Sequence, residues 1–589
     1  MTLWKRNAAV VAVLLGLSGL VQAWLIHHAA VPGQDAVRFV RIAQKIDRQG
    51  LLPTLKNEGQ QPLFPVTVWI VSRGLACTVG PSPSAWATSV QLAAAVPLVL
   101  AVVPVYFVAL RLVGPRGAAA GGMLFCVLPE VARLGADGLS DSTHLLLFAL
   151  ALWAVVEALT GERRAARDKG NGVRGSGSEV QGSGLRVQGV GPKSHRYALF
   201  LWLALAGGLT AAAALTRVET MVLPAALAVA TVGFQLARRW RRPWRRVAVA
   251  AGCYGLGFAM VFGPYLAATG SSTPRAAIAR ALGKFPSDGT RPSVPAAAMN
   301  KAAWQLDDGR PMSFAYKEPS VSRRWRGYRA ATVLLAEELP QAFGYWVGPL
   351  ALVGLWQLRR TPPRREDRFA QAVFLLFCLG AIHHAAGEGY LSARHLLPLV
   401  VVGIGCGGHG LIAFARSIAK AVVGGQPEAT TRSAATRAVA ALAVAACLAP
   451  QLEPLHAARR PHRSAGRWLA SEAEVSGAVL DTRGWTGLYS GRPTYGYQDA
   501  WQAFCDPRLA YVVIERWELD YQSDRSRTLK ALLARAAEPV ASFCDSPAGA
   551  SGHGVMVYRW NGEQFYQWLA AVDHPNPETS RCNLPCKRL

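Results

Sequence analysis

The stretch that decides the fold is residues 27–65, HHAAVPGQDAVRFVRIAQKIDRQGLLPTLKNEGQQPLFP. It is polar and amphipathic, follows an apolar run, and carries Asp35 only a few residues beyond that run. A carboxylate near the hydrocarbon boundary costs roughly 3 kcal/mol if it faces lipid, so it is expected to face protein or water. We therefore predict that Asp35 lies at the centre of a reaction site.

The composition is that of a polytopic membrane protein. Of 589 residues, 51% are hydrophobic and only 17% are charged, which is more apolar than a soluble domain of this size. The formal net charge of +27 would suggest nucleic acid in a soluble protein. Here the basic residues fall in blocks between apolar runs, so membrane topology explains them better and no nucleic-acid partner is expected.

Eleven apolar runs of about the length needed to cross hydrocarbon follow one another along the chain. We expect transmembrane helices at residues 8–26, 86–110, 118–132, 144–159, 197–215, 220–236, 247–268, 339–358, 369–386, 396–414 and 438–448. The first run follows a short basic segment and lacks a small-residue cleavage site, so we interpret it as an uncleaved helix with a cytoplasmic amino end. Gly403, Gly405, Gly407 and Gly408 in the tenth run favour close helix packing.

Every second connection between these runs is rich in basic residues, whereas the short connections that alternate with them hold only isolated basic residues. The basic residues concerned are Arg111, Arg116, Arg163, Arg164, Arg167, Lys169, Arg238, Arg239, Arg241, Arg242, Arg359, Arg360, Arg364 and Arg365. Cytoplasmic loops are enriched in Lys and Arg. This pattern predicts a multi-pass cell membrane protein, of the bacterial inner membrane, with its carboxyl end extracytoplasmic.

The predicted membrane domain, residues 1–450, contains three long connections. Residues 27–85 form the first outer loop. Residues 161–193 are rich in Gly, Ser and Arg and predict a disordered cytoplasmic insertion. Residues 269–338 form a second outer loop, in which 276–285 is either an amphipathic helix on the membrane face or part of a solvated loop.

Residues 451–589 predict a small extracytoplasmic α/β domain. Helical patterns at 463–474 and 526–537 alternate with strand patterns at 477–481, 510–515 and 555–560. This tail carries no nucleophile motif, no set of metal ligands and no phosphate loop. Their absence favours a lid or an acceptor-recognition domain. One or two disulfides are plausible there among Cys505, Cys544, Cys582 and Cys586.

Further polar residues stand at the ends of apolar runs on the predicted outer side. Residues 133–142 read RLGADGLSDS and carry Asp137 and Asp141, the latter just before the fourth run. Arg217 follows the fifth run, and residues 390–398 read YLSARHLLP, with Arg394 at the start of the tenth. We expect Asp35, Asp141 and Arg394 to meet in a water-filled hollow at the outer leaflet.

This order of motifs over about residues 14–410 resembles the GT-C membrane glycosyltransferases. The nearest group is similar to the protein O-mannosyltransferases and aminoarabinose lipid A transferases, with the related bacterial core-sugar transferases. The resemblance implies a hexosyl- or pentosyltransferase that moves a sugar from a polyprenyl-phosphate donor to a lipid, glycan or protein acceptor. This chain has Asp35-Ala36 in place of the Asp-Glu pair of the eukaryotic mannosyltransferases, which argues against a protein acceptor.

The resemblance also implies roles for individual residues. Asp35 matches the general base of an inverting transfer, with Asp141 as the second catalytic carboxylate. The leaving phosphate needs cations, for which Arg394 is the first candidate, ahead of Arg217 and Lys56. Asp137, Tyr390 and His395 are the remaining site candidates. Asp35, Asp137 and Asp141 could hold Mg²⁺ or Mn²⁺, but the spacing does not require a metal, and we expect a metal-independent reaction.

Other readings of the same residues stay open at this point. Asp35 and Asp141 could be helix caps, Arg394 could reach toward lipid headgroups, and Arg217 could form an interface pair with Glu219. The whole chain could instead be a transporter or lipid flippase, or an assembly factor without catalysis. In the last case the acidic and basic side chains would point apart.

Overall fold

The structure is a computed structural model of the chain. It describes residues 3–80, 82–172, 192–237, 244–270, 312, 314, 324–359, 364–423, 429–471, 476–521, 523–544 and 554–573. Most of the predicted insertion at 161–193, and all of the predicted helix at 276–285, lie outside these residues, as do Cys582 and Cys586.

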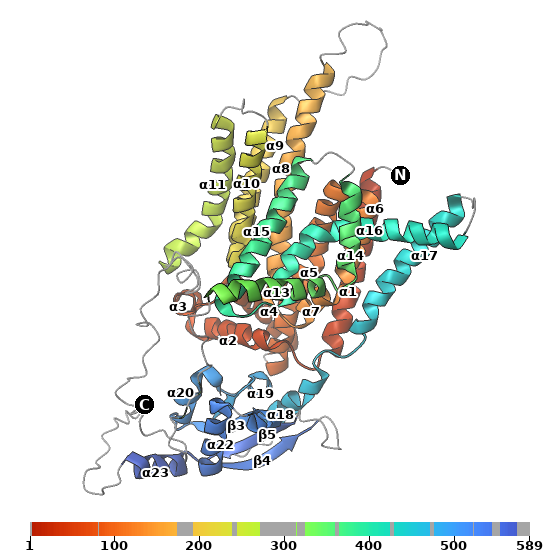
Figure 1. Cartoon of the computed structure of the whole chain (residues 1–589). Helices are drawn as coiled ribbons and strands as arrows, with labels where there is room; N and C mark the ends of the chain where they lie inside the picture. The colour runs from red at the N-terminus through yellow and green to blue at the C-terminus, as the bar shows by residue number, and fades with distance from the viewer. Residues whose placement is uncertain are drawn as a thin grey trace.

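A bundle of long helices forms the upper part of the molecule, and an α/β domain lies beneath it (Figure 1). Short helices lie across the end of the bundle, between it and the α/β domain (Figure 1). The described helices up to residue 448 are α1 (Leu3–His28), α2 (Gln34–Gln49), α3 (Leu51–Asn57), α4 (Leu63–Val79), α5 (Pro83–Val113), α6 (Pro115–Val127), α7 (Pro129–Ala136), α8 (Ser140–Gly172), α9 (Pro192–Ala214), η1 (Val218–Met221), α10 (Val222–Ala237), α11 (Trp244–Thr269), α13 (Arg324–Ala342), α14 (Val347–Leu358), α15 (Arg365–Glu388), η4 (Ala393–Leu396), α16 (Leu397–Val423) and α17 (Ala429–Leu448).

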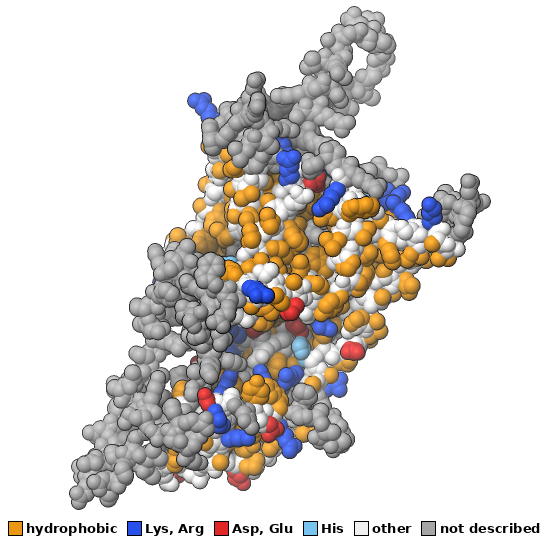
Figure 2. Space-filling view, in the orientation of Figure 1, with side chains coloured by type: hydrophobic (Ala, Val, Ile, Leu, Met, Phe, Trp, Pro, Cys, Tyr) orange, Lys and Arg blue, Asp and Glu red, His pale blue; other side chains and the backbone are white. Residues whose placement is uncertain are grey.

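The polytopic helical fold is confirmed. Eight helices within the described residues are long and apolar enough to cross a membrane, and the bent pair α6 and α7 makes a ninth. The prediction of eleven also counted the shorter apolar segments 218–232 and 347–358. Hydrophobic side chains cover most of the visible face of the bundle, whereas charged side chains gather at its upper end and over the α/β domain (Figure 2).

One predicted span is bent. The run 118–132 is not a single straight helix, because α6 ends at Val127 and α7 starts at Pro129, with a bend of 51° between them. Proline disfavours the α conformation in the residue before it and fits the first turn of a helix. The sequence signal for this bend was therefore Pro129.

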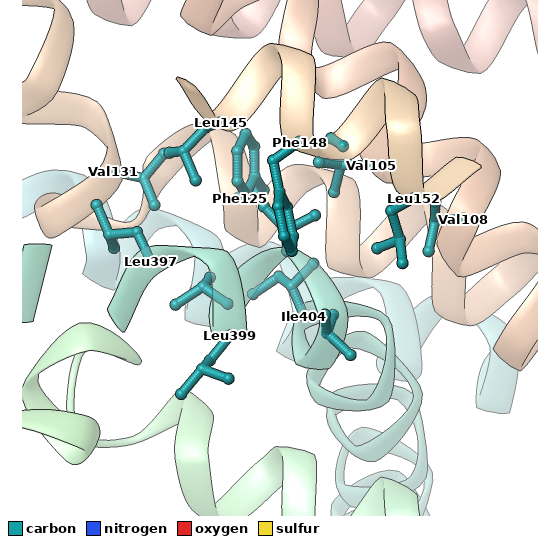
Figure 3. Packing of buried hydrophobic residues seen from close by; sticks show 14 of the residues in the cluster. Val105, Val108, Phe125, Val131, Leu145, Phe148, Leu152, Leu397, Leu399 and Ile404 are labelled. Carbon is teal, nitrogen blue, oxygen red and sulfur yellow. The ribbon is translucent and has the colours of Figure 1, made fainter. Parts of the chain in front are cut away.

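The core of the bundle joins α5, α6, α8 and α16. Phe125, Phe148, Leu152 and Ile404 are at most 1% exposed, and their side chains face one another (Figure 3). Aliphatic and aromatic side chains pack closely here, with no polar atoms that would need hydrogen-bond partners. This packing fixes the helices, and the polar residues at their ends, relative to one another.

Glycines of α16 allow this close packing, as predicted. A methyl group at Gly405 would lie 2.9 Å from the Ala109 Cβ, and one at Gly407 would lie 2.9 Å from the Val347 side chain. Gly408 is tighter still, because a methyl there would lie 2.2 Å from the backbone nitrogen of Gly121 on α6. The backbone of α6 cannot move aside as a flexible side chain could.

Gly408→Ala is therefore expected to destabilise the protein by about 1–3 kcal/mol, the usual cost of overpacking. Gly380→Ala on α15 is the matched control, since nothing lies within 4 Å of the position of its added methyl. Alanine in that helix should be neutral or gain up to about 1 kcal/mol. The melting temperatures of the two detergent-solubilised variants measure the difference, and equal values would contradict the packing account.

The carboxyl-terminal part contains a five-stranded sheet of order β2-β1-β3-β5-β4. β2, β1 and β3 are parallel, and β5 pairs antiparallel with both β3 and β4. The elements are η5 (Ala449–Gln451), η6 (Ala457–Arg459), α18 (Arg460–Ser471), β1 (Ala478–Asp481), α19 (Trp485–Ser490), β2 (Thr494–Tyr495), η7 (Tyr497–Asp499), α20 (Ala500–Phe504), β3 (Leu509–Glu515), α21 (Arg516–Asp520), α22 (Asp524–Ala536), β4 (Ala537–Phe543), β5 (Val555–Trp560) and α23 (Gly562–Asp573).

The α/β class of this part is confirmed, and α18, β1, β3, α22 and β5 match predicted elements within a few residues. β2 and β4 were missed. Cys505 and Cys544 are free thiols and are not bonded to each other. The domain boundary near residue 450 stays a prediction.

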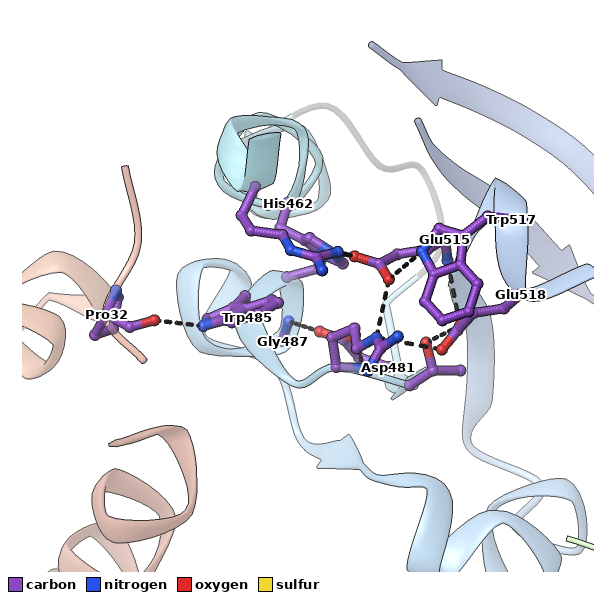
Figure 4. Close-up of polar contacts among 12 residues, drawn as sticks. Pro32, His462, Asp481, Trp485, Gly487, Glu515, Trp517 and Glu518 are labelled. Carbon is purple, nitrogen blue, oxygen red and sulfur yellow. Dashed lines mark hydrogen bonds and ion pairs between the residues drawn. The ribbon is translucent and has the colours of Figure 1, made fainter. Parts of the chain in front are cut away.

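A buried polar cluster lies at the carboxyl ends of β1 and β3 (Figure 4). The Glu515 carboxylate pairs with Arg459 and, at 2.9 Å, with Arg483. His462 lies 3.1 Å from the same carboxylate through Nε2 and 2.9 Å from the Thr486 hydroxyl through Nδ1. Burial lowers the pKa of His462 to about 4; the charge of Asp481 opposes this shift, and the charges of Arg459 and Arg483 add to it.

This cluster predicts a stability that depends on pH. The pKa of His462 is lower in the folded protein than the value near 6.5 of an unfolded chain, so folding favours the neutral ring. Its contribution is complete above pH 6.5 and is lost as the pH falls toward 4, by about 3 kcal/mol. The melting temperature should fall more steeply over this range in the wild type than in His462→Gln. Parallel curves would contradict the assignment.

Candidate active site

Four elements bring the predicted site residues to one end of the bundle. Asp35 lies in the first turn of α2, whose N-cap is Gly33, so the reading of Asp35 as the helix cap is wrong. Asp141 lies in the first turn of α8. Arg217 precedes η1, and Arg394 lies within η4 just before α16.

Asp35 and Arg394 form the first ion pair of the site. The Arg394 Nη1 donates to the Asp35 Oδ2 at 2.6 Å across 359 positions of sequence. The side chains are 51% exposed for Asp35 and 32% for Arg394. Exposure of this degree keeps the pair accessible to solvent and weak. The Arg394 Nε is buried and has no hydrogen-bond partner among the described residues.

Asp141, Arg217 and Glu219 form a second and more buried group. The Arg217 Nη1 donates to the Asp141 carboxylate, and its Nη2 donates to Glu219 at 2.9 Å. The side chains of Asp141 and Arg217 are only 7% and 14% exposed. The predicted pair of Arg217 with Glu219 is therefore present, but it is part of a three-membered network that includes Asp141.

These groups line a small hollow. The lining residues are Asp141, His144, Leu145, Arg217, Glu219, Phe377, Arg394, His395 and Pro398. Asp35 is not among them, but it pairs with Arg394, which is. The space between the lining residues amounts to about 200 Å³, open solvent included, and the expectation that it holds water stays a prediction.

Two histidines face the hollow. His144 lies 2.7 Å from the Thr220 hydroxyl through Nε2. His395 stacks edge-on with Tyr390 at 5.7 Å and with His384 at 5.5 Å, and its Nδ1 is buried without a partner among the described residues. His144 was not predicted as a site residue, although it follows Asp141 by three positions, a spacing that places two residues on one helix face.

Other predicted residues lie outside the hollow. Lys56 is exposed on α3 and does not line it. Tyr390 is half exposed and does not line the hollow, although its ring lies 5.7 Å from that of His395. The Asp137 carboxylate lies 2.7 Å from the His456 Nε2, and the backbone carbonyl of Asp137 accepts a hydrogen bond from the Gly33 amide. Asp137 therefore joins the loops around the site and does not enter it.

The described residues contain no group of three or more His, Cys, Asp or Glu side chains placed to hold a metal ion. Asp35 and Asp141 are each engaged by a different arginine, and Asp137 lies against His456. The three carboxylates considered as possible Mg²⁺ or Mn²⁺ ligands thus have separate partners in this conformation.

No protein-family model matches the sequence, and no curated protein sequence is significantly similar to it. Solved structures do match. ArnT from Cupriavidus metallidurans bound to undecaprenyl phosphate aligns over 95% of this chain and 98% of its own, at 14% identity and a TM-score of 0.55. ArnT in the apo state aligns over 94% and 98%, at 13% identity and a TM-score of 0.56.

The archaeal oligosaccharyltransferase AglB from Archaeoglobus fulgidus, in complex with an inhibitory peptide and a dolichol-phosphate, also matches. It aligns over 96% of this chain and 75% of its own, at 12% identity and a TM-score of 0.50. Identities this low speak for the fold and not for the reaction. The predicted GT-C fold is confirmed over nearly the whole chain.

Proposed function

From this GT-C glycosyltransferase fold, we propose that the chain is an integral-membrane glycosyltransferase. It transfers a sugar from a polyprenyl-phosphate-linked donor to a lipid, glycan or protein acceptor on the extracytoplasmic face of the membrane. The observation that carries the proposal is that Asp141, Arg217 and Arg394 line one hollow and that Arg394 also binds Asp35 of α2. Relatives in fold bind undecaprenyl phosphate and dolichol-phosphate.

Asp35 is the proposed general base. The acceptor hydroxyl oxygen attacks the anomeric carbon of the donor sugar, its proton passes to the Asp35 carboxylate, and the bond between that carbon and the phosphate oxygen breaks. Polyprenyl phosphate leaves from the opposite face, so the configuration inverts. A positioned base contributes about 10²- to 10⁴-fold to such a step, and the partial exposure of Asp35 suits a group that must meet an acceptor.

Arg394 is the proposed ligand of the donor phosphate. It lines the hollow, its buried Nε has no partner among the described residues, and guanidinium groups bind phosphate bidentately. A phosphate there would compete with Asp35 for the guanidinium and release the carboxylate for proton transfer. Arg217 faces the same hollow but is held by two carboxylates, so its role is to hold Asp141 in place and to offset the buried carboxylate charge.

The remaining expectations follow from this reaction. The Arg394 guanidinium meets the leaving-group charge, and the proposed transfer is metal-independent. The positive-inside pattern supports a cytoplasmic amino terminus and an extracytoplasmic hollow.

The direct test is mass spectrometry of cell-surface lipids, glycans and proteins from cells with and without the gene. The expected result is one sugar-bearing species that disappears with the gene and returns with the wild-type copy. An unchanged surface composition, or accumulation of an unmodified substrate on one side of the membrane only, would instead support a transporter or flippase.

A further inference from the structure

The five-residue connection between α1 and α2, residues 29–33, is held from two distant parts of the chain. The amide of Ala30 donates to the Leu455 carbonyl at 3.0 Å, and the amide of Gly33 donates to the Asp137 carbonyl at 2.9 Å. Helix α2 starts at the next residue and carries Asp35 in its first turn. The position of the Asp35 carboxylate therefore depends on where this connection is held.

Trp485 of the α/β domain supplies a third bond to the same connection. Its indole N–H donates to the Pro32 carbonyl at 2.7 Å (Figure 4). The ring is almost fully buried and packs in one cluster with Val37 and Val40 of α2. A buried indole with its N–H bonded fixes both the orientation of the ring and the carbonyl that it meets.

The polar cluster of the α/β domain holds Trp485 from behind. The His462 ring lies 5.2 Å from the Trp485 ring, and the Arg459 guanidinium lies 5.5 Å from it. Both residues also contact Glu515 at the end of β3. Trp485 thus packs against residues that are themselves bonded to the end of β3, so the position of its ring is fixed by the sheet.

Arg41, six residues after Asp35 in α2, reaches into the domain from the other side. It approaches Gly484 and Gly496 so closely that a methyl group at either would lie 3.1–3.2 Å from a guanidinium nitrogen. These glycines follow β1 and β2. Burial lowers the pKa of Arg41, and the charges of Asp481 and Asp499 oppose this shift. Trp485 therefore holds the start of α2 by a hydrogen bond, and the buried Arg41 guanidinium packs against the domain further along the helix.

We propose that the α/β domain is a clamp on α2 and that Trp485 and Arg41 are positioning residues for Asp35. This inference rests on the proposed function, in which the Asp35 carboxylate takes the acceptor proton. Displacement of a reacting group by about 1 Å can cost about 10²-fold in rate. Loss of the Trp485 or the Arg41 contact should therefore slow transfer and leave donor binding unchanged.

The test compares Trp485→Phe with Trp517→Phe. Trp517 belongs to the same cluster and donates its indole N–H to Glu515 at 2.7 Å, so both variants lose one indole hydrogen bond, but only Trp485 touches the α2 connection. Initial rates of transfer are measured in membranes with increasing amounts of total lipid extract of the host, which supplies polyprenyl-linked sugars. Amide hydrogen exchange of residues 34–49 is measured on the purified full chain.

Trp485→Phe is expected to lower the maximal rate about tenfold, with the half-saturating amount of extract unchanged within twofold, and to speed exchange in α2. Trp517→Phe should keep the maximal rate within twofold and leave that exchange unchanged. Equal loss of rate in both variants, or unchanged exchange and rate in Trp485→Phe, would overturn the clamp. Full activity of Asp35→Asn would instead overturn the proposed function, whatever the exchange shows.

Discussion

Asp35→Asn is expected to lower sugar transfer by about 10²- to 10⁴-fold, the contribution of a positioned general base. Asparagine has nearly the shape of aspartate but cannot accept the proton of the acceptor hydroxyl. The lost ion pair with Arg394 is half exposed and contributes at most about 1 kcal/mol to stability. The variant should therefore insert and fold as the wild type does. Product formation in membranes, normalised to the amount of protein, measures the effect.

Asp47→Asn is the matched control for this prediction. Asp47 lies in the same helix and pairs with Arg73 at 2.5 Å. Neither residue lines the hollow. It should retain transfer within about twofold. If Asp35→Asn keeps most of its activity, or if both variants lose activity alike, Asp35 has no part in proton transfer.

Arg217→Ala is expected to lower the free energy of unfolding by about 3–5 kcal/mol. The substitution leaves Asp141 and Glu219 without their shared cation, and Asp141 is almost fully buried. Removal of one partner from a buried ion pair leaves an uncompensated charge, which costs far more than loss of an exposed pair. The melting temperature in detergent should therefore fall by many degrees.

Arg394→Ala is the comparison, because its pair with Asp35 is exposed. It should lose transfer but change stability by no more than about 1 kcal/mol. Adding Asp141→Asn to Arg217→Ala should recover part of the lost stability, since the buried charge is removed. Similar melting temperatures for the two single arginine variants would contradict the division of the site into a buried and an exposed pair.

The sequence predicted the membrane fold and four of the residues that line the hollow, Asp141, Arg217, Arg394 and His395, because those signals are local. Asp141 and Arg394 each stand at the start of an apolar run, and the runs themselves specify the helices. The pairing of side chains was not predictable, because it depends on how α2, α8 and η4 pack. Nothing in the sequence indicated that Arg394 would hold Asp35 while Arg217 held Asp141.

The missed strands have physical explanations. β4 contains Pro539, which argues against a strand, but β4 lies at the edge of the sheet, where a missing amide is tolerated. β2 has two residues only and no pattern to detect. The contact of Trp485 with Pro32 joins positions 453 apart in sequence, so only the folded chain reveals it.

The hypothesis of an assembly factor required the acidic and basic side chains to point apart. Asp35 and Arg394 are bonded instead, and Arg394 shares the hollow with Asp141 and Arg217. This arrangement favours a reaction site.

The most direct measurement uses the purified full chain in liposomes that contain polyprenyl-phospho-sugars and membrane lipids from the host. Mass spectrometry follows free polyprenyl phosphate and sugar-bearing acceptor over time. The predicted result is that both appear together with the wild type and neither appears with Asp35→Asn. Movement of intact donor between leaflets without release of polyprenyl phosphate, or equal release by both proteins, would contradict the proposed transfer.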